Sequence, residues 1–175
     1  DPLRTETKSV IRKLHKEGFT NIVMMTGDSY RTAEAIAKCV GVDHFYAEVL
    51  PEDKADFVQQ EKAKGHKVVM IGDGINDSPA LSAADVGIAI SDGAEIAREI
   101  ADITVSADDL NEIVILKMLS EALMKRIHKN YRQIVTFNAG LIALGVAGVI
   151  PPTTSAVLHN TSTLLIGMDS MKTLL

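Results

Sequence analysis

The sequence predicts an α/β fold with a parallel sheet, followed by a hairpin of two apolar helices. In residues 1–109, short apolar runs alternate with amphipathic segments, a pattern typical of strands and helices that follow each other in turn. The composition then changes, because residues 133–171 contain one charged side chain, Asp169. Residues 110–132 continue a helical pattern between the two regions. We therefore expect an α/β domain over 1–109, a connecting helix over 110–132 and two helices over 133–175.

The elements of the first region follow from apolar spacing and from glycine and proline positions. The first helix has Val10, Ile11 and Leu14 on one face and ends at Gly18. Pro51 suits the first turn of a later helix. The remaining predicted elements are a strand at 21–25, a helix at 29–40, a strand at 45–48, a helix at 51–64, a strand at 68–71, a helix at 80–84, a strand at 86–90, a helix at 94–100 and a strand at 103–105.

Residues 134–150 form an apolar run of 17 residues, which is about the shortest that spans a bilayer. Pro151 and Pro152 end it, and residues 153–175 form a weaker second segment. Lys and Arg precede the first segment, and Lys172 lies at the far end of the second. Because such cations gather on the cytoplasmic side, we expect a transmembrane hairpin in the cell membrane, with the α/β domain and both chain ends cytoplasmic. The alternative is a buried core helix.

The composition excludes some other classes of protein. A formal net charge of −5 and the absence of Trp argue against a nucleic-acid binder. Cys39 is the single cysteine, so no disulfide or CxxC metal site is possible within the chain. Cys39 lies in an apolar helical pattern, and we expect a buried, inert thiol.

The strongest chemical signal follows the strand predicted at 68–71. Gly72 and Gly74 flank Asp73, and Asn76 and Asp77 come directly after. Ligands bind beyond the carboxyl ends of strands in such sheets, and glycine permits a close backbone approach. Oxygen side chains at this position suit Mg²⁺. The motif therefore predicts a magnesium-dependent phosphoryl-transfer site, with Asp73 as the first metal ligand.

Two further segments supply phosphate-binding groups. Thr26, Gly27 and Asp28 follow the strand predicted at 21–25, where hydroxyl and amide donors can hold a phosphate. Lys54 can neutralise charge on a transferring phosphoryl group. Each has a simpler interpretation: Thr26 or Asp28 as a helix cap, and Lys54 as a solvated surface lysine. No Asp in the chain follows an apolar strand in an Asp-Lys-Thr-Gly-Thr setting that would mark the nucleophile.

These motifs, in this order, resemble the second half of the phosphorylation domain of P-type cation-transporting ATPases. The carrying segments are Thr26-Gly27-Asp28, Pro51-Glu52-Asp53-Lys54 and Gly72-Asp73-Gly74-Ile75-Asn76-Asp77-Ser78-Pro79. That domain is Rossmann-like and belongs to the haloacid-dehalogenase-like superfamily. The two final apolar segments resemble the heavy-metal-transporting branch, and the resemblance covers essentially the whole chain.

The resemblance implies ATP-driven transport of a heavy-metal cation through an aspartyl phosphate, with Mg²⁺ and ATP as cofactors. Thr26 and Gly27 would hold the phosphate, and Lys54 would contact the acyl phosphate. Asp73 would bind Mg²⁺, with Asn76 and Asp77 completing the loop. The phosphorylated Asp, most of the nucleotide site and further membrane helices would lie upstream, so the chain resembles a carboxy-terminal fragment. The strands at 22–25 and 68–71 would then flank a missing nucleophile strand.

Polar groups within the apolar region are candidate ligands of the transported ion, because such groups are costly at membrane depth. The candidates are His159, Ser162, Thr163 and Asp169. Imidazole and oxygen ligands favour a divalent ion such as Zn²⁺, Co²⁺ or Cd²⁺ over Cu⁺. His159-Asn160-Thr161-Ser162-Thr163 resembles the His-Glu-Gly-Ser-Thr motif of the cobalt- and zinc-exporting subgroup and departs from it at positions 160 and 161. The alternative is that Ser and Thr bond the backbone of their own helix.

Two other functions remain open from the sequence. A soluble Mg²⁺-dependent phosphatase of the same superfamily shares the Gly-Asp-Gly loop, but it predicts an early Asp-x-Asp nucleophile and no hydrophobic hairpin, which this chain does not match. A truncated, non-catalytic membrane protein that keeps the old scaffold is the other alternative.

Overall fold

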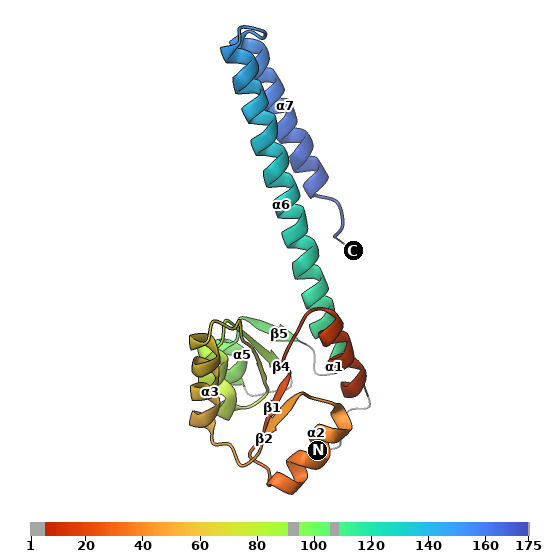
Figure 1. The fold of residues 1–175 in the computed structure, drawn as a ribbon, viewed down its shortest axis with the longest axis vertical. Helices are drawn as coiled ribbons and strands as arrows, with labels where there is room; N and C mark the ends of the chain where they lie inside the picture. The colour runs from red at the N-terminus through yellow and green to blue at the C-terminus, as the bar shows by residue number, and fades with distance from the viewer. Residues whose placement is uncertain (1–5, 91–94, 106–108, 175) are drawn as a thin grey trace. The chain divides into compact units, whose positions relative to one another are not determined.

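The computed structural model describes residues 6–90, 95–105 and 109–174. The chain divides into two compact units, Asp1–Ile115 and Leu116–Leu175. The first unit alternates helices and strands and is coloured red to green in Figure 1. The second contains two long helices. This division falls after Ile115, inside a continuous helix.

The first unit has the predicted order of elements, with ends that differ by a few residues. They are α1 (Thr7–Lys16), β1 (Val23–Met25), α2 (Tyr30–Val40), β2 (His44–Tyr46), α3 (Pro51–Ala63), β3 (Val69–Gly72), the 3₁₀ turn η1 (Ile75–Asp77), α4 (Ser78–Ala83), β4 (Val86–Ile90), α5 (Glu95–Ile100), β5 (Ile103–Val105) and the start of α6 (Asn111–Val146). The helix predicted from residue 94 begins, among the described residues, at Glu95.

The strands form two parallel sheets. β1 pairs with β2, and β3, β4 and β5 follow one another in a second sheet with β4 in the middle. The predicted parallel arrangement is therefore confirmed. Among the described residues, β1 and β3 are not hydrogen-bonded to each other, so each keeps an open edge. Ile71 on β3 is 39% exposed, which is high for an isoleucine of a strand in a parallel sheet.

A cluster of apolar side chains holds the helices against the second sheet. It contains Val58 of α3, Met70 of β3, Leu81 of α4, Ala89 of β4 and Ala97 of α5, and it includes Ala80. Three helices thus share one core with two neighbouring strands. This core positions the loop after β3, because both neighbours of that loop, β3 and α4, are anchored in it.

Cys39 is exposed, contrary to the expectation of a buried thiol. The buried side chains of α2 are Ala33, Ala37 and Val40. These positions form a stripe with i, i+4, i+7 spacing, and residue 39 lies about 100° away from residue 40 around the helix. The apolar character of the segment was therefore a poor guide to the orientation of Cys39.

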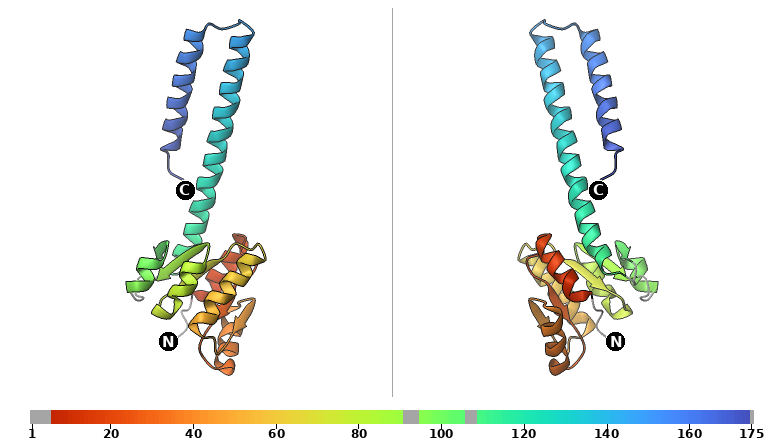
Figure 2. Two further views of the ribbon diagram at one scale, coloured as in Figure 1. Left: turned by 90° about the vertical axis from the view of Figure 1, so that its left-hand side faces the viewer. Right: turned by 90° about the vertical axis from the view of Figure 1, so that its right-hand side faces the viewer.

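The second unit is a helical hairpin. The rest of α6 and α7 (Pro152–Ser170) run antiparallel and lie side by side in both views of Figure 2. Residues 147–151 join them, and Gly148 there has a φ of 70°, which favours glycine. The two helices form a hairpin, and its transmembrane character stays a prediction. α6 ends at Val146, before the predicted end at residue 150.

None of the helices in the described part of the chain is both long enough and apolar enough to cross a membrane.

Replacement of Gly87 by Ala is expected to destabilise the first unit by about 1–3 kcal/mol, as overpacking of a core does. An added Cβ at Gly87 would lie 2.8 Å from the backbone oxygen of Leu81, which is itself 2% exposed. Urea denaturation of the chain measures the effect. Gly145→Ala is the control, because nothing lies within 4 Å of its added Cβ. Equal stabilities of the two variants would show that α4 moves freely away from β4.

The contacts of the Asp85 carboxylate lead us to expect that the folded chain loses stability in acid. Its carboxylate accepts hydrogen bonds from the Val68 amide at 3.0 Å and from Lys67 Nζ at 3.0 Å. The hydrogen bond from the Val68 amide first, and then the one from Lys67, lower the pKa of Asp85 below its ordinary value. The stabilising contribution is therefore complete above the unfolded pKa of about 3.9, and it is lost as the pH falls through the lower pKa of the folded state.

The stability difference between the unaltered chain and Asp85→Asn should accordingly be constant above about pH 5 and shrink below about pH 4. Urea denaturation at several pH values measures this difference. Asp56→Asn, which removes a charge from an exposed position on α3, is the control. A difference that stays constant down to pH 2 would contradict the role of Asp85.

Candidate phosphoryl-transfer site

The loop after β3 is built around the carboxylate of Asp77. Asp77 Oδ2 accepts hydrogen bonds from the amides of Asp73 and Gly74, each at 3.4 Å. Its other oxygen, Oδ1, accepts a hydrogen bond from Lys54 Nζ at 2.7 Å. The side chains of Lys54 and Asp77 are 15% and 12% exposed, so this ion pair is largely shielded from water. One carboxylate thereby joins the start of α3 to the turn that follows β3.

Gly72 is required for this arrangement by its close approach to Asp77. An added Cβ at position 72 would lie 2.5 Å from Asp77 Cβ, which is closer than side chains tolerate. The following helix α4 then begins at Ser78, with a proline at its second position. Glycine at 72 and the turn at 75–77 together place the Asp77 carboxylate where it accepts hydrogen bonds from the amides of Asp73 and Gly74.

Asp73 and Asn76 are exposed, in contrast to Asp77. Among the described residues, no side-chain hydrogen bond or ion pair engages the Asp73 carboxylate. Its two oxygens are thus available at the carboxyl end of β3, where open α/β sheets bind ligands. Mg²⁺ is commonly held by one or two carboxylates together with phosphate oxygens and water, and the donors at this loop fit that chemistry. The residues present fit Mg²⁺ with Asp73 as its carboxylate ligand.

The loop after β1 forms a compact turn of its own. Thr26 Oγ1 donates to Asp28 Oδ2 at 3.0 Å and accepts from the Asp28 amide at 3.1 Å. The Val49 amide donates to the Thr26 carbonyl at 3.0 Å, which connects this turn to the segment that enters α3. Glu48 in that segment has a φ of 56°, an unusual conformation for a residue with a side chain.

The structure therefore unites the predicted site residues in two groups. Lys54, Asp73, Gly74 and Asp77 share direct contacts, and Gly72 is packed against Asp77. Thr26 and Asp28 form the second group, joined to the first by backbone bonds at 48–50. Among the described residues, no hydrogen bond or ion pair links Thr26 or Asp28 directly to Asp73 or Asn76.

The candidate ligands in the second unit are not gathered at one point. His159 Nδ1 is 2.8 Å from Asn138 Oδ1. Ser162 and Thr163 donate their hydroxyls to the His159 carbonyl, at 2.8 and 3.0 Å. This is the backbone bonding within a helix that the sequence left open as an alternative. Among the described residues, no group of three His, Cys, Asp or Glu side chains is placed to hold a metal ion.

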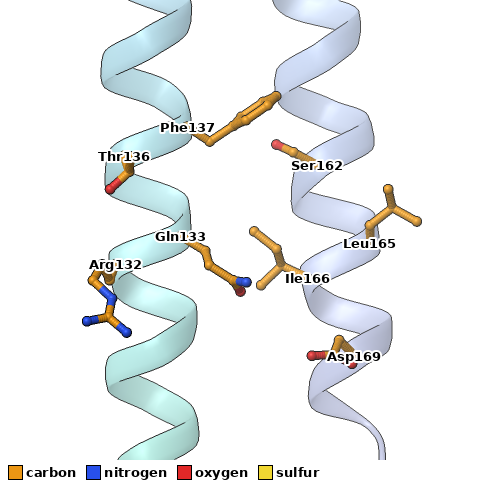
Figure 3. A pocket seen from close by; sticks show the side chains of 8 residues that line it. All are labelled: Arg132, Gln133, Thr136, Phe137, Ser162, Leu165, Ile166 and Asp169. Carbon is orange, nitrogen blue, oxygen red and sulfur yellow. The ribbon is translucent and has the colours of Figure 1, made fainter.

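Asp169 is separated from His159 by ten residues of one helix, a rise of about 15 Å. Its carboxylate lies 3.2 Å from Lys129 Nζ and 2.6 Å from Lys172 Nζ. Figure 3 shows Asp169 and Ser162 beside a groove of about 700 Å³ between α6 and α7, which Arg132, Gln133 and Phe137 also line. One ion therefore cannot be held by His159 and Asp169 together in this arrangement.

Sequence reasoning missed two features of these sites. It did not pair Lys54 with Asp77, because 23 residues separate them and no local pattern connects them. It also took Arg126 and Lys129 only as charges on the cytoplasmic side and did not predict that they and Asn130 contact the end of α7. Their i, i+3, i+4 spacing places them on one helix face and was a signal available in the sequence.

Comparisons with known proteins agree with the motifs. Two family models, both described as haloacid-dehalogenase-like hydrolase, match residues 1–85 and 55–118. A manganese-exporting P-type ATPase of Mycobacterium leprae is 39% identical over 173 residues, which is 98% of this chain and 24% of the relative. Copper-transporting ATPase 2 of Rhizobium meliloti is 44% identical over 158 residues, 90% of this chain and 19% of the relative.

A solved structure extends this likeness to the fold. The crystal structure of a zinc-transporting PIB-type ATPase in the E2P state matches with a TM-score of 0.85 and 31% identity, over 95% of this chain and 27% of that one. This chain thus spans about a quarter of the length of the relatives that it matches. Together, the motifs, the fold and the relatives show that the chain contains a haloacid-dehalogenase-like domain and belongs to the heavy-metal P-type ATPases.

Proposed function

We propose that this chain acts as part of a longer protein that transports a heavy-metal cation across a membrane, driven by ATP through an aspartyl phosphate. The observation that carries the proposal is the Lys54–Asp77 pair beneath an exposed Asp73, at the end of a parallel strand. The named activities of the relatives, which match along almost the whole chain, support it.

Lys54 would stabilise the transferring phosphoryl group. An ammonium group has three donor hydrogens, and Asp77 accepts one of them. Two remain for phosphoryl oxygens, and the ion pair keeps the long side chain in one direction. The Thr26 hydroxyl donates to Asp28 in this structure, so it must rotate before it donates to a phosphate oxygen. Gly27, with no side chain, leaves the backbone accessible beside it.

Mg²⁺ bound at Asp73 would neutralise phosphate charge and help to orient the substrate. Asp77 has a different role, because Lys54 and two amides already occupy its oxygens. Asp77 holds the loop, and Asn76, which is neutral and exposed, can donate to a phosphate oxygen. Division of these roles between two carboxylates keeps one of them free for the metal.

The nucleophilic aspartate would come from another part of the protein. β1 and β3 have open edges, and a strand inserted between them would pair with both and cover Ile71. Its carboxyl end would then lie between the Thr26 turn and the Asp73 loop, the two groups that make no direct contact here. ATP would bind mostly outside this chain.

We propose that the hairpin of α6 and α7 lies among other helices in the membrane. α7 has no buried residue. Exposed apolar side chains are spread over both helices, including Phe137, Ile142, Leu144 and Leu164. An apolar surface of this extent indicates a partner surface or lipid. A likeness that covers 95% of the chain also includes most of this second unit. Companion helices would supply the apolar environment that α6 and α7 lack on their own.

The transported ion is proposed to be divalent. His159 and Asn138 offer an imidazole nitrogen and an amide oxygen, which suit Mn²⁺ or Zn²⁺ better than Cu⁺. The relatives named above include manganese, copper and zinc transporters, so the choice of ion depends on this local chemistry and on residues elsewhere in the protein.

Asp73→Ala in the full-length protein should lower phosphoenzyme formation from ATP and Mg²⁺ by at least about 100-fold, because a metal ligand is lost from the transferring group. Trapping of labelled phosphoenzyme in membranes measures this. Asp56→Ala, at an exposed position on α3, is the matched control and should keep full phosphorylation. Undiminished phosphoenzyme in Asp73→Ala would assign Mg²⁺ to another group.

His159→Ala should raise the metal concentration needed for half-maximal ATPase activity by about 10-fold or more, because one ligand or pathway contact is removed. Formation of the phosphoenzyme from ATP should still occur. Thr161→Ala is the control, since the Thr161 hydroxyl bonds the Val157 carbonyl of its own helix. An unchanged metal dependence in His159→Ala would make the His159–Asn138 contact structural only.

A further inference from the structure

The open end of the hairpin is held by polar contacts that no part of the proposed chemistry uses. They join Arg126, Lys129 and Asn130 of α6 to Asp169, to Ser170 and to backbone carbonyls at the end of α7 and just beyond it. This set is here called the α6–α7 latch. Lys129 Nζ lies 3.2 Å from Asp169 Oδ2. Asn130 Nδ2 donates to Ser170 Oγ at 2.6 Å.

Arg126 caps the carboxyl end of α7. Its guanidinium donates to the carbonyls of Ser170 at 3.2 Å, of Thr173 at 2.6 Å and of Lys172. The last carbonyls of a helix have no partner within the helix and carry partial negative charge. A guanidinium has five N–H donors in a rigid plane, so it can serve several such carbonyls together. The contact therefore attaches the end of α7, at Ser170, and the residues just beyond it to one point on α6.

Apolar packing does not fix the position of α7 in this chain. None of its described side chains is buried, and on the part of α6 beyond residue 115 only Leu141 is buried among the described residues. Exposed apolar side chains permit α7 to slide along α6, because a shift replaces one weak apolar contact by another of similar energy. Specific polar contacts between α6 and α7 are what distinguish one register from the next.

The latch and the His159–Asn138 pair belong to the same antiparallel register. From Lys129 to Asn138 there are nine residues along α6, and from Asp169 to His159 there are ten residues back along α7. These correspond to rises of about 14 and 15 Å. A slip of α7 by one turn would break the latch and move His159 about 5 Å away from Asn138.

We propose that Arg126 and the Lys129–Asp169 pair are positioning residues, which set the register of α7 on α6 and thereby hold His159 against Asn138. Asp169 is then a part of the latch and not a ligand of the transported ion. The register inference rests on the contacts alone. Its consequence for metal transport rests on the proposed function.

The register is tested by the distance between spin labels at Val146 and Val157, which are 85% and 63% exposed and lie outside the latch. The labels are placed in the 175-residue chain in detergent, with Cys39→Ser. The unaltered chain should show one narrow distance distribution. Arg126→Gln and Lys129→Glu should broaden it or shift it by about 5 Å, one helical turn. Lys125→Gln is the control, because Lys125 is 81% exposed and outside the latch.

Charge exchange separates a specific latch from a general loss of folding. Lys129→Glu with Asp169→Lys restores an opposite-charge pair and should restore the narrow distribution, whereas each single change should not. A narrow, unshifted distribution in Arg126→Gln and in Lys129→Glu would overturn the proposal. Failure of the exchanged pair to restore the distribution, with helix content unchanged, would overturn the role of the Lys129–Asp169 pair.

In the full-length protein, Lys129→Glu should lower metal-stimulated ATPase activity by about 10-fold at an unchanged level of phosphoenzyme, and the exchanged pair should recover most of the activity. Unchanged activity in Lys129→Glu would contradict the link from register to transport. Absence of phosphoenzyme in the unaltered protein would contradict the proposed function, and the spin-label distances would still decide the register.

Discussion

The arrangement of the phosphoryl-transfer site depends on one carboxylate, that of Asp77. One of its oxygens accepts a hydrogen bond from Lys54, and the other accepts hydrogen bonds from the amides of Asp73 and Gly74. A shielded carboxylate with no partner is costly, so the loop, the strand end and the start of α3 must meet for Asp77 to be satisfied. Removal of Lys54 alone would leave the Asp77 carboxylate, whose side chain is 12% exposed, without its cationic partner. The loop after β3 and the start of α3 therefore depend on each other for their positions in the site.

The open edges of β1 and β3 extend the same argument from the loop to the sheet. Unpaired strand edges are unfavourable features that folded proteins usually cover. Here both edges lie beside the two groups of site residues, with Thr26 after β1 and Asp73 after β3. One inserted strand would therefore complete the hydrogen bonding of the sheet and bring its own carboxyl end to the phosphate-binding groups. The same strand would thus complete both the sheet and the catalytic site.

The sequence predicted most of the first unit because its signals are local. Gly18, Gly41 and Gly65 punctuate helices, and each adopts a positive φ in the structure. The Gly72–Asp77 motif places its groups within six residues of chain. The orientation of Cys39 and the Lys54–Asp77 pair were missed because they depend on packing between separate elements. In the apolar region, composition indicated a hairpin but overestimated the helical length of its first arm, since residues 147–151 form the turn.

The polar groups of the hairpin show why residue type alone did not separate a ligand from a structural contact. Asp169 and His159 are both polar side chains in an apolar segment, and both were predicted to be ligands of the transported ion. Their neighbours distinguish them: two ammonium groups already neutralise Asp169, whereas His159 faces a neutral amide that can share a cation with it. A divalent ion at Asp169 would have to displace two cations that the chain itself supplies. The same ion at His159 would meet no such competition, so the balance of charge favours the middle of the hairpin over its open end.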